Sequence, residues 1–303
     1  MNKHQMCWNT GICYGCGFLK IIRNKNDIIN DYINGSSLTE LSKKEKVSRH
    51  VITRIIKCAG IKIVNRWNKS KFNERIFDII DTEEKAYWLG FIFADGYIAN
   101  IENKKPHYVF ELSLAGVDIN HLHKFNKFME YDGDNVKIGN IKREGKVYTR
   151  CRWSITNKHL WMTLNNYGCT PNKSLTLNFP NENIFKSPDL IKCFIRGYFD
   201  GDGCFSQHLC KTIVSPNVSI IGTKQFLDKI IKYVKLPAKF LHDFRHSQNT
   251  LSIYFNLENT FKFLDIIYNK ATIFLERKYL KYTFFKNKSR PLKEWEDFIG
   301  QNR

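Results

Sequence analysis

Two related segments constrain the fold of this chain more than any other feature. Residues 87–98 read YWLGFIFADGYI, and residues 194–205 read FIRGYFDGDGCF. When they are aligned on Asp95 and Asp202, which lie 107 residues apart, the small residues around each aspartate also coincide. A repeat of this length predicts two copies of one folding unit. The matched pairs are Gly90 with Gly197, Ala94 with Gly201, and Gly96 with Gly203.

The stretches that follow each segment extend the repeat. After each aspartate come two strand-like stretches, a helical stretch, two more strand-like stretches and another helical stretch. This order predicts an α+β fold of two pseudo-symmetric αββαββα units, the first over 85–185 and the second over 186–303. Each unit is also predicted to end its last helix with a lysine, Lys173 in the first and Lys278 in the second.

The small residues of each segment indicate how the two predicted helices pack. Residues four apart lie on one face of a helix, and an interior glycine costs about 1 kcal/mol relative to alanine. We therefore expect a contact that leaves no room for side chains, with the two helices packed backbone to backbone. Gly96 and Gly203 are expected to take the left-handed conformation that ends each helix. The small residues in contact would be Gly90, Ala94, Gly197 and Gly201.

This packing would bring Asp95 and Asp202 together at the ends of the two helices. Two carboxylates repel each other there, and the partial negative charge of each helix C-terminus adds to the repulsion. A divalent cation between them relieves it. We expect Asp95 and Asp202 to be metal ligands, because metal-dependent hydrolysis of a phosphodiester uses an acid pair of this kind.

The charge balance points to a polyanionic partner. Lys and Arg number 48 against 29 Asp and Glu, which gives a formal net charge of +19 over 303 residues. With 43% apolar residues, the chain is a folded protein and not a basic disordered tail. DNA, RNA or an anionic membrane surface could neutralise such a charge. The membrane is disfavoured, since no apolar run approaches the ~18–20 residues that span a bilayer.

The cysteines and the N-terminus bear on the compartment. Nine cysteines are an odd number, which suits a reducing compartment better than a disulfide framework. The first residues lack the apolar core of a secretory signal. We therefore expect an intracellular protein that is not secreted.

Residues 27–60 have the pattern of three short helices, with apolar residues at helical spacing in three groups. Ser36 or Ser37 can cap the second helix, and Ser48 the third. The segment TELSKKEKVSRHVITRIIK resembles the small helix-turn-helix domains of resolvases and transposases, although Lys46 stands where these usually have glycine. A solvated basic face is the alternative to DNA binding. The resemblance implies DNA contacts from the third helix at Arg49, His50, Thr53, Arg54 and Lys57.

A cysteine-rich stretch precedes these helices. Zinc prefers four nitrogen or sulfur ligands, and a CxxC pair is the usual half-site. Only Cys13 and Cys16 form such a pair, so structural Zn²⁺ and a set of reduced thiols both fit the spacing. We expect this stretch and the helices to form a domain over 1–60, followed by a basic linker over 61–84. The four candidate zinc ligands are His4, Cys7, Cys13 and Cys16.

A strand in each unit has polar and apolar residues in alternation, which places the two kinds on opposite faces. An arginine- and lysine-rich sheet face can contact guanine edges and phosphates, and a solvated face is the alternative. The residues expected toward the core of the first unit are Val147, Thr149, Cys151, Trp153 and Ile155. Those expected toward DNA are Lys146, Tyr148, Arg150, Arg152 and Ser154, with Lys239, Arg245, Ser252, Tyr254 and Asn256 in the second unit.

Residues 85–285 resemble the LAGLIDADG homing endonucleases in their monomeric, two-repeat form. The resemblance lies in the two motifs, their spacing and the order of elements. The resemblance implies a saddle of two sheets over the major groove of double-stranded DNA and a double-strand break that promotes mobility of the intron or gene. It implies that Asp95 and Asp202 bind Mg²⁺, for which Mn²⁺ can substitute, and that Lys173 and Lys278 are catalytic. Asp200 has Phe93 as its counterpart, at a position that is not a metal ligand in the family.

Two other functions stay open, and a third, an intein, is disfavoured. An RNA maturase uses the same fold without cleavage, and a regulator combines the fold with a helix-turn-helix and usually lacks the acids. Both acids and both lysines are present here, which favours a nuclease. An intein needs Cys or Ser at its first residue and a terminal His-Asn, and this chain ends in IGQNR.

Overall fold

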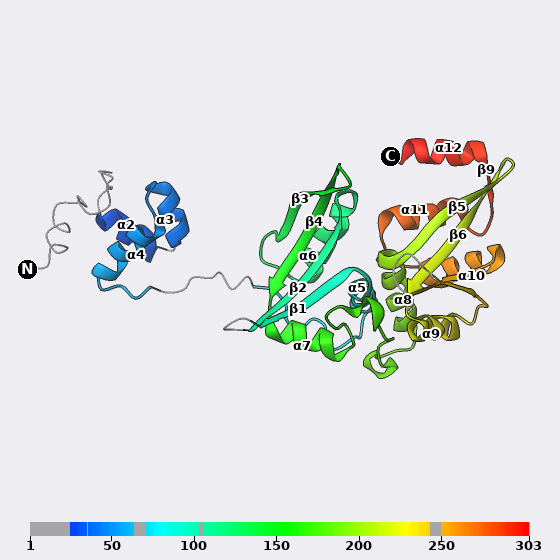
Figure 1. Ribbon diagram of the computed structural model, residues 1–303, viewed down its shortest axis with the longest axis horizontal. Helices are drawn as coiled ribbons and strands as arrows, with labels where there is room; N and C mark the ends of the chain where they lie inside the picture. Colours follow the sequence, from blue (N-terminus) through cyan, green and yellow to red (C-terminus); the bar gives the residue numbers. More distant parts are fainter. Residues whose placement is uncertain (1–24, 35, 64–70, 103–105, 243–249, 303) are drawn as a thin grey trace, which may run out of the picture. The chain divides into compact units, whose positions relative to one another are not determined.

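The computed structural model describes residues 25–34, 36–63, 71–102, 106–242 and 250–302 (Figure 1). The chain divides into two compact units, Met1–Lys69 and Ser70–Arg303. The division falls inside the predicted basic linker. The second half of that linker belongs to the larger unit, because Ile76, Phe77 and Ile80 are buried in its core.

The smaller unit contains the helices α2 (Lys25–Ile33), α3 (Leu38–Lys44) and α4 (Arg49–Cys58). Ser37 and Glu40 form a capping box at the start of α3. Ser48 takes the N-cap position of α4 without a side-chain hydrogen bond to the helix. Lys46, in the turn before α4, has a φ of 52°, the left-handed conformation that explains why related turns prefer glycine. The core of this unit consists of Ile28, Tyr32, Leu41, Ile52, Ile55 and Ile56.

The first repeat of the larger unit has the predicted order of elements. Helix α5 passes into a hairpin, a second helix, a second hairpin and a third helix. The bounds are α5 (Glu83–Asp95), β1 (Gly96–Glu102), β2 (Pro106–Ala115), η1 (Gly116–Asp118), α6 (Ile119–Phe128), β3 (Val136–Arg143), β4 (Lys146–Thr156) and α7 (Lys158–Asn166). The short helices η2 (Lys173–Leu175) and η3 (Glu182–Ile184) lead to the second repeat.

The second repeat follows the same order and then continues. Its elements are α8 (Asp189–Asp202), β5 (Gly203–Cys210), β6 (Ile213–Gly222), α9 (Lys224–Val234), β7 (Lys239–His242), β8 (Leu251–Tyr254) and α10 (Leu257–Tyr268). Beyond the repeat come α11 (Glu276–Phe285), β9 (Arg290–Pro291) and α12 (Leu292–Gln301). Strand β9 pairs with β6, so this extension joins the second sheet.

Both sheets are antiparallel and have the same topology. The strand orders are β1-β2-β4-β3 and β5-β6-β8-β7, which confirms that the two repeats are copies of one αββαββα unit. One face of each sheet is covered by helices. In the first, Phe125 of α6 packs on Phe110 and Trp153 of the sheet. In Figure 1 the two sheets lie on either side of α5 and α8.

Helices α5 and α8 pack backbone to backbone, as predicted. A Cβ atom built at Gly90 would lie 1.9 Å from the carbonyl oxygen of Phe194. One built at Gly201 would lie 2.4 Å from the Cβ of Ala94. No side chain fits in these contacts, so the glycines are required by the helix pair.

The left-handed conformation predicted for Gly96 and Gly203 is wrong. Both residues are extended, with φ and ψ of −72° and 138° and of −75° and 140°. Each helix therefore passes directly into the strand that follows. A Cβ at Gly96 would lie 2.4 Å from the carbonyl oxygen of Ile92, and one at Gly203 would lie 2.1 Å from Cδ2 of Phe199. The lack of space, and not a left-handed turn, accounts for these glycines.

Candidate active site

Asp95 and Asp202 are the last residues of α5 and α8. The two helices approach so closely here that a Cβ atom at Gly201 would lie 3.1 Å from Oδ2 of Asp95. The structure therefore brings the two predicted metal ligands to one place, each on the junction between a helix and the first strand of its sheet.

The electrostatic environment of the pair is unfavourable for two ionised carboxylates. Burial, and then the neighbouring charge of Asp202, raise the pKa of Asp95 to about 7. Burial also raises the pKa of Asp202. The positive charges of Lys173 and Lys278 oppose both shifts without cancelling them. Uncompensated negative charge at this point favours the binding of a cation.

The donor set suits a hard divalent cation such as Mg²⁺. Mg²⁺ is commonly held by one or two carboxylates, with water and substrate phosphates completing the octahedron. Within the ranges that the structure describes, no cluster of three or more His, Cys, Asp and Glu side chains could hold a metal by itself. The pair of Asp95 and Asp202 therefore fits a metal that shares its ligands with a substrate better than a closed structural site.

Lys173 and Lys278 were predicted to end the last helix of each repeat, but both lie beyond those helices. Lys173 begins η2, after α7 has ended at Asn166, and Lys278 lies in the first turn of α11, after α10 has ended at Tyr268. The helical pattern extends past the true helix ends because a loop with apolar residues follows each one. Both ammonium groups nevertheless lie at the ends of the helices that carry the acid pair.

Each lysine binds main-chain carbonyls at the end of the motif helix of its own repeat. Lys278 is buried, and its Nζ donates to the carbonyl oxygens of Phe199 at 2.5 Å, Asp200 at 2.9 Å and Gly203 at 2.5 Å. Lys173 donates to the carbonyl oxygens of Ala94, at 3.2 Å, and Gly96. The two ammonium groups thus stand at the negative ends of α5 and α8, where cations are stabilising.

Burial disfavours the charged form of Lys278. Desolvation lowers the pKa of Lys278 to about 8, although Asp200, Asp95 and Asp202 all favour its charged form. All three of its donors are engaged by carbonyl oxygens. In this arrangement Lys278 supplies positive charge to the site and does not offer a free amine.

Asp200 has a structural role that the sequence did not predict. Its carboxylate is buried and accepts hydrogen bonds from the Tyr87 hydroxyl at 2.8 Å and the Leu275 amide at 2.7 Å. The Tyr268 hydroxyl donates to its other oxygen. The bonds join α5, α8, α10 and the residue before α11, so Asp200 holds the helix that carries Lys278. The counterpart Phe93 instead packs edge-on against Phe194, at 5.2 Å between ring centroids.

Two ion pairs near the site also escaped prediction. Arg196 of α8 is buried and pairs with Glu83 at the start of α5. Arg277, beside Lys278, pairs with Asp118 of the first repeat at 3.0 Å. Each pair joins residues more than a hundred positions apart, and no local spacing could have revealed it.

The alternation predicted for 146–155 is confirmed in its second half only. Cys151 and Trp153 are fully buried, and Arg150 and Arg152 point to the other face with 43% and 48% of their side chains exposed. Val147 and Thr149 were expected in the core but are exposed on the outer part of the β3–β4 hairpin. Lys146 and Tyr148 lie on this exposed part, and Ser154 lies nearer the center of the sheet.

A glutamate occupies the center of the same face. Glu111 of β2 binds Arg150 at 2.9 Å and Arg152 at 3.3 Å, and its own side chain is only 16% exposed. The register places Glu111 opposite Ser154 and Ser113 opposite Arg152. The carboxylate therefore orients both guanidinium groups on the surface predicted to face DNA.

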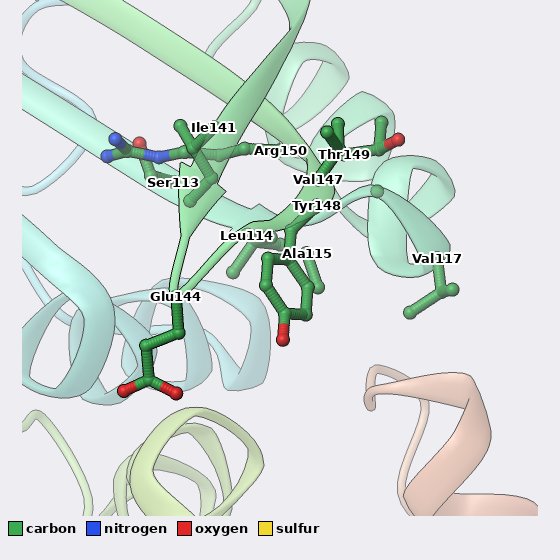
Figure 2. Close-up of a pocket in the computed structure, with 11 residues that line it drawn as sticks. Ser113, Leu114, Ala115, Val117, Ile141, Glu144, Val147, Tyr148, Thr149 and Arg150 are labelled. Carbon is green, nitrogen blue, oxygen red and sulfur yellow. The ribbon is translucent and has the colours of Figure 1, made fainter.

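An open cavity of about 1000 Å³ lies on this hairpin (Figure 2). Tyr148 and Glu144 extend from the hairpin toward one side of it, and Val117 lies past the end of β2. Arg150 and Ser113 also line it. The cavity does not include the acid pair, and its lining comes from both faces of the β3–β4 hairpin.

In the second sheet, some predicted DNA contacts must be corrected. Ser252 is only 7% exposed, because it lies between Ile221 and Leu241 of the neighbouring strands. Asn256 lies beyond β8 and caps α10 by accepting the Asn259 amide at 2.8 Å. Lys239 and Tyr254 are opposite each other on the outer face. Arg245 lies outside the described residues.

The predicted DNA-contacting residues of the smaller unit share the solvent side of α4. Arg49, His50 and Lys57 are exposed and Thr53 and Arg54 are half-buried, opposite a buried isoleucine face. The four candidate zinc ligands lie outside the described residues: His4, Cys7, Cys13 and Cys16. Across the described ranges, no helix is both long and apolar enough to cross a membrane.

The chain matches no protein-family model and no curated protein. Among solved structures it is similar to the meganuclease I-SmaMI bound to uncleavable DNA, with 13% identity and a TM-score of 0.45 over 72% of this chain and 91% of that one. It is similar to variants of the homing endonuclease I-DmoI, with 16% identity and a TM-score of 0.39 over 66% and 98%. It is also similar to the LAGLIDADG meganuclease I-AabMI bound to uncleaved DNA, with 13% identity and a TM-score of 0.42 over 71% and 96%.

Proposed function

We propose that this protein is a site-specific endonuclease that cuts double-stranded DNA by Mg²⁺-dependent hydrolysis, and that the cut promotes mobility of its intron or gene. The observation that carries the proposal is the convergence of Asp95 and Asp202 at the ends of two helices packed backbone to backbone. A monomer suffices for a cut in both strands, because one chain contains both motifs.

The chemistry follows from charge and position. Asp95 and Asp202 would hold Mg²⁺, or Mn²⁺ in its place, and the bound cation would supply Lewis-acid polarisation of the phosphodiester. The two carboxylates would fix the position of this cation in the site. Lys173 and Lys278 keep positive charge beside them, and this limits the cost of gathering two carboxylates and a phosphate in a partly buried site.

The smaller unit is proposed to add DNA contacts outside the main target. Arg49, His50 and Lys57 lie together on the exposed side of α4, opposite its buried face. Removing residues 1–69 should weaken DNA binding and shorten the footprint, whereas an unchanged footprint would exclude this role. Metal analysis of the intact and truncated chains tests whether the N-terminal cysteines bind Zn²⁺.

The nuclease is tested on duplex DNA that the protein itself selects from a random pool. With Mg²⁺ we expect cleavage of both strands of the selected duplex and no cleavage in the presence of a chelator. Binding without cleavage in Mg²⁺ or Mn²⁺ would contradict the proposal and favour a regulator. Preferential binding of the structured RNA of an adjoining intron, again without DNA cleavage, would favour a maturase.

A further inference from the structure

The outer faces of the two sheets, opposite the helices, differ in chemistry although the folds of the repeats match. Strand register defines each face. In the first sheet, Arg152 lies between Ser113 and Lys137, and Arg150 lies between Ala115 and Gly139. Lys146 is further along the same strand. Basic side chains therefore concentrate on this face, around the carboxylate of Glu111.

Over the described residues, the corresponding face of the second sheet carries one charged side chain. Strand β6 alternates strictly between buried residues and half-exposed ones, and the half-exposed set includes Asn217, Ser219 and Ile221. Ser206 and His208 of β5 lie on the same face, opposite Asn217 and Ser215. Of the residues on this face that the structure describes, Lys239 is the only lysine, arginine or acid.

These two sets of side chains suit different base edges in the major groove. Arginine binds O6 and N7 of guanine with two hydrogen bonds, and a carboxylate accepts from N4 of cytosine. Asparagine pairs with adenine, aliphatic groups contact the thymine methyl, and serine is indifferent. Arg150, Arg152 and Glu111 together match G·C pairs, whereas Asn217 and Ile221 match A·T pairs.

We infer that the DNA target is chemically asymmetric: G·C pairs lie under the first sheet, where arginines and a glutamate read them, and an A·T-rich half lies under the second, read by uncharged side chains. This rests on the proposed DNA-binding function. Arg150 and Arg152 are specificity-determining residues for one half, and Asn217 and Ile221 for the other.

The test is a binding selection from random duplex DNA with the full chain, followed by the same selection with two variant pairs. The wild type should return a site with one G·C-containing half and one A·T-rich half. The pair Arg150→Gln and Arg152→Gln should lose the guanine preference in one half only. The matched pair Asn217→Ala and Ile221→Ala should relax only the other half. Substituting a preferred G·C pair should weaken wild-type binding by about 5- to 150-fold and leave the arginine variant nearly unaffected.

The possible failures are distinguishable. Two halves of equal composition, or an arginine variant that alters both halves or neither, would overturn the inference while leaving cleavage intact. An asymmetric selected site that the wild type does not cut in Mg²⁺ would overturn the proposed nuclease and leave the inference standing. A chain that selects no sequence at all would overturn both. Thermal melting of each variant confirms that a changed selection does not come from unfolding.

Discussion

Gly90 and Gly197 are reciprocal contacts of the two motif helices. A Cβ atom at Gly90 would lie 1.9 Å from the carbonyl oxygen of Phe194, and one at Gly197 would lie 1.9 Å from that of Tyr87. Each glycine thus receives the backbone of the opposite helix. The distance between Asp95 and Asp202 depends on this contact, since any side chain here would separate the helix ends that carry them.

Alanine at either glycine should therefore destabilise the larger unit. Overpacking typically costs about 1–3 kcal/mol, and a clash with rigid backbone belongs at the upper end or beyond. Chemical denaturation of Gly90→Ala and Gly197→Ala measures the loss. The control is Gly300→Ala in α12, where a Cβ meets nothing within 4 Å and where alanine should stabilise by up to about 1 kcal/mol. If the motif variants were as stable as the control, the close packing would be refuted.

Asp200→Ala should destabilise the fold and reduce cleavage, because three donors lose their acceptor. An unsatisfied buried donor costs about 1–3 kcal/mol, and the Tyr87, Tyr268 and Leu275 groups all bind this carboxylate. Tyr268→Phe removes one donor together with its hydrogen bond, so it should destabilise the fold less than Asp200→Ala does. Stability is measured by denaturation, and cleavage at saturating protein on selected DNA. An Asp200→Ala variant with unchanged stability would exclude the anchoring role of Asp200.

Stability without metal should decrease as pH rises, and Mg²⁺ should restore it. The folded state holds the pKa of Asp95 at about 7, above the value of about 3.9 in an unfolded chain. The native state thus retains a proton that the unfolded state has released, so stability is lost between about pH 4 and pH 7. A bound cation replaces the proton, and we expect a larger rise in Tm with Mg²⁺ at about pH 8 than at about pH 5.5.

Asp95→Asn should raise Tm at about pH 8 in the absence of metal and remove the Mg²⁺ effect. In a unit of this size each kcal/mol corresponds to about 2–4 °C. Asp228→Asn in α9 is the control, because this aspartate pairs with Lys224 on the surface. An equal response to Mg²⁺ in Asp95→Asn and the control would show that the cation binds elsewhere.

Glu111→Gln should release Arg150 and Arg152 and remove a negative charge from the outer face. We expect about fivefold tighter binding to random DNA, equivalent to about 1 kcal/mol, with a steeper dependence on salt. The matched control is Glu258→Gln, a surface acid that pairs with Lys262 on α10. The DNA affinity of both variants is measured over a range of salt concentrations. Equal affinities and salt dependences in the two variants would contradict the role of Glu111.

The repeat allowed the two αββαββα units, the helix contact and the acid pair to be predicted from sequence. These features depend on local spacing, which is visible along the chain. The conformation of Gly96 and Gly203 was predicted wrongly, because glycine serves a left-handed turn and a close contact equally well. Only the packed structure distinguishes the two.

Features that depend on strand register or on distant partners could not be predicted. Ser252 has the correct alternation for the outer face, but longer neighbours on two adjacent strands cover it. Glu111 meets the arginines only because β2 and β4 pair in one particular register. The two lysines lie in other elements than predicted, since an apolar loop and a helix end have similar patterns.

Asp95 and Asp202 are proposed to form one metal site that cuts DNA. The most direct measurement is single-turnover cleavage of the selected duplex in Mg²⁺ by the wild type, Asp95→Asn and Asp202→Asn, with DNA binding determined in the same samples. We predict that each variant binds as the wild type does and cleaves at least about 100-fold more slowly, because loss of either carboxylate removes several kcal/mol of metal-dependent stabilisation. Cleavage at the wild-type rate by either variant, while bound to DNA, would contradict the assignment.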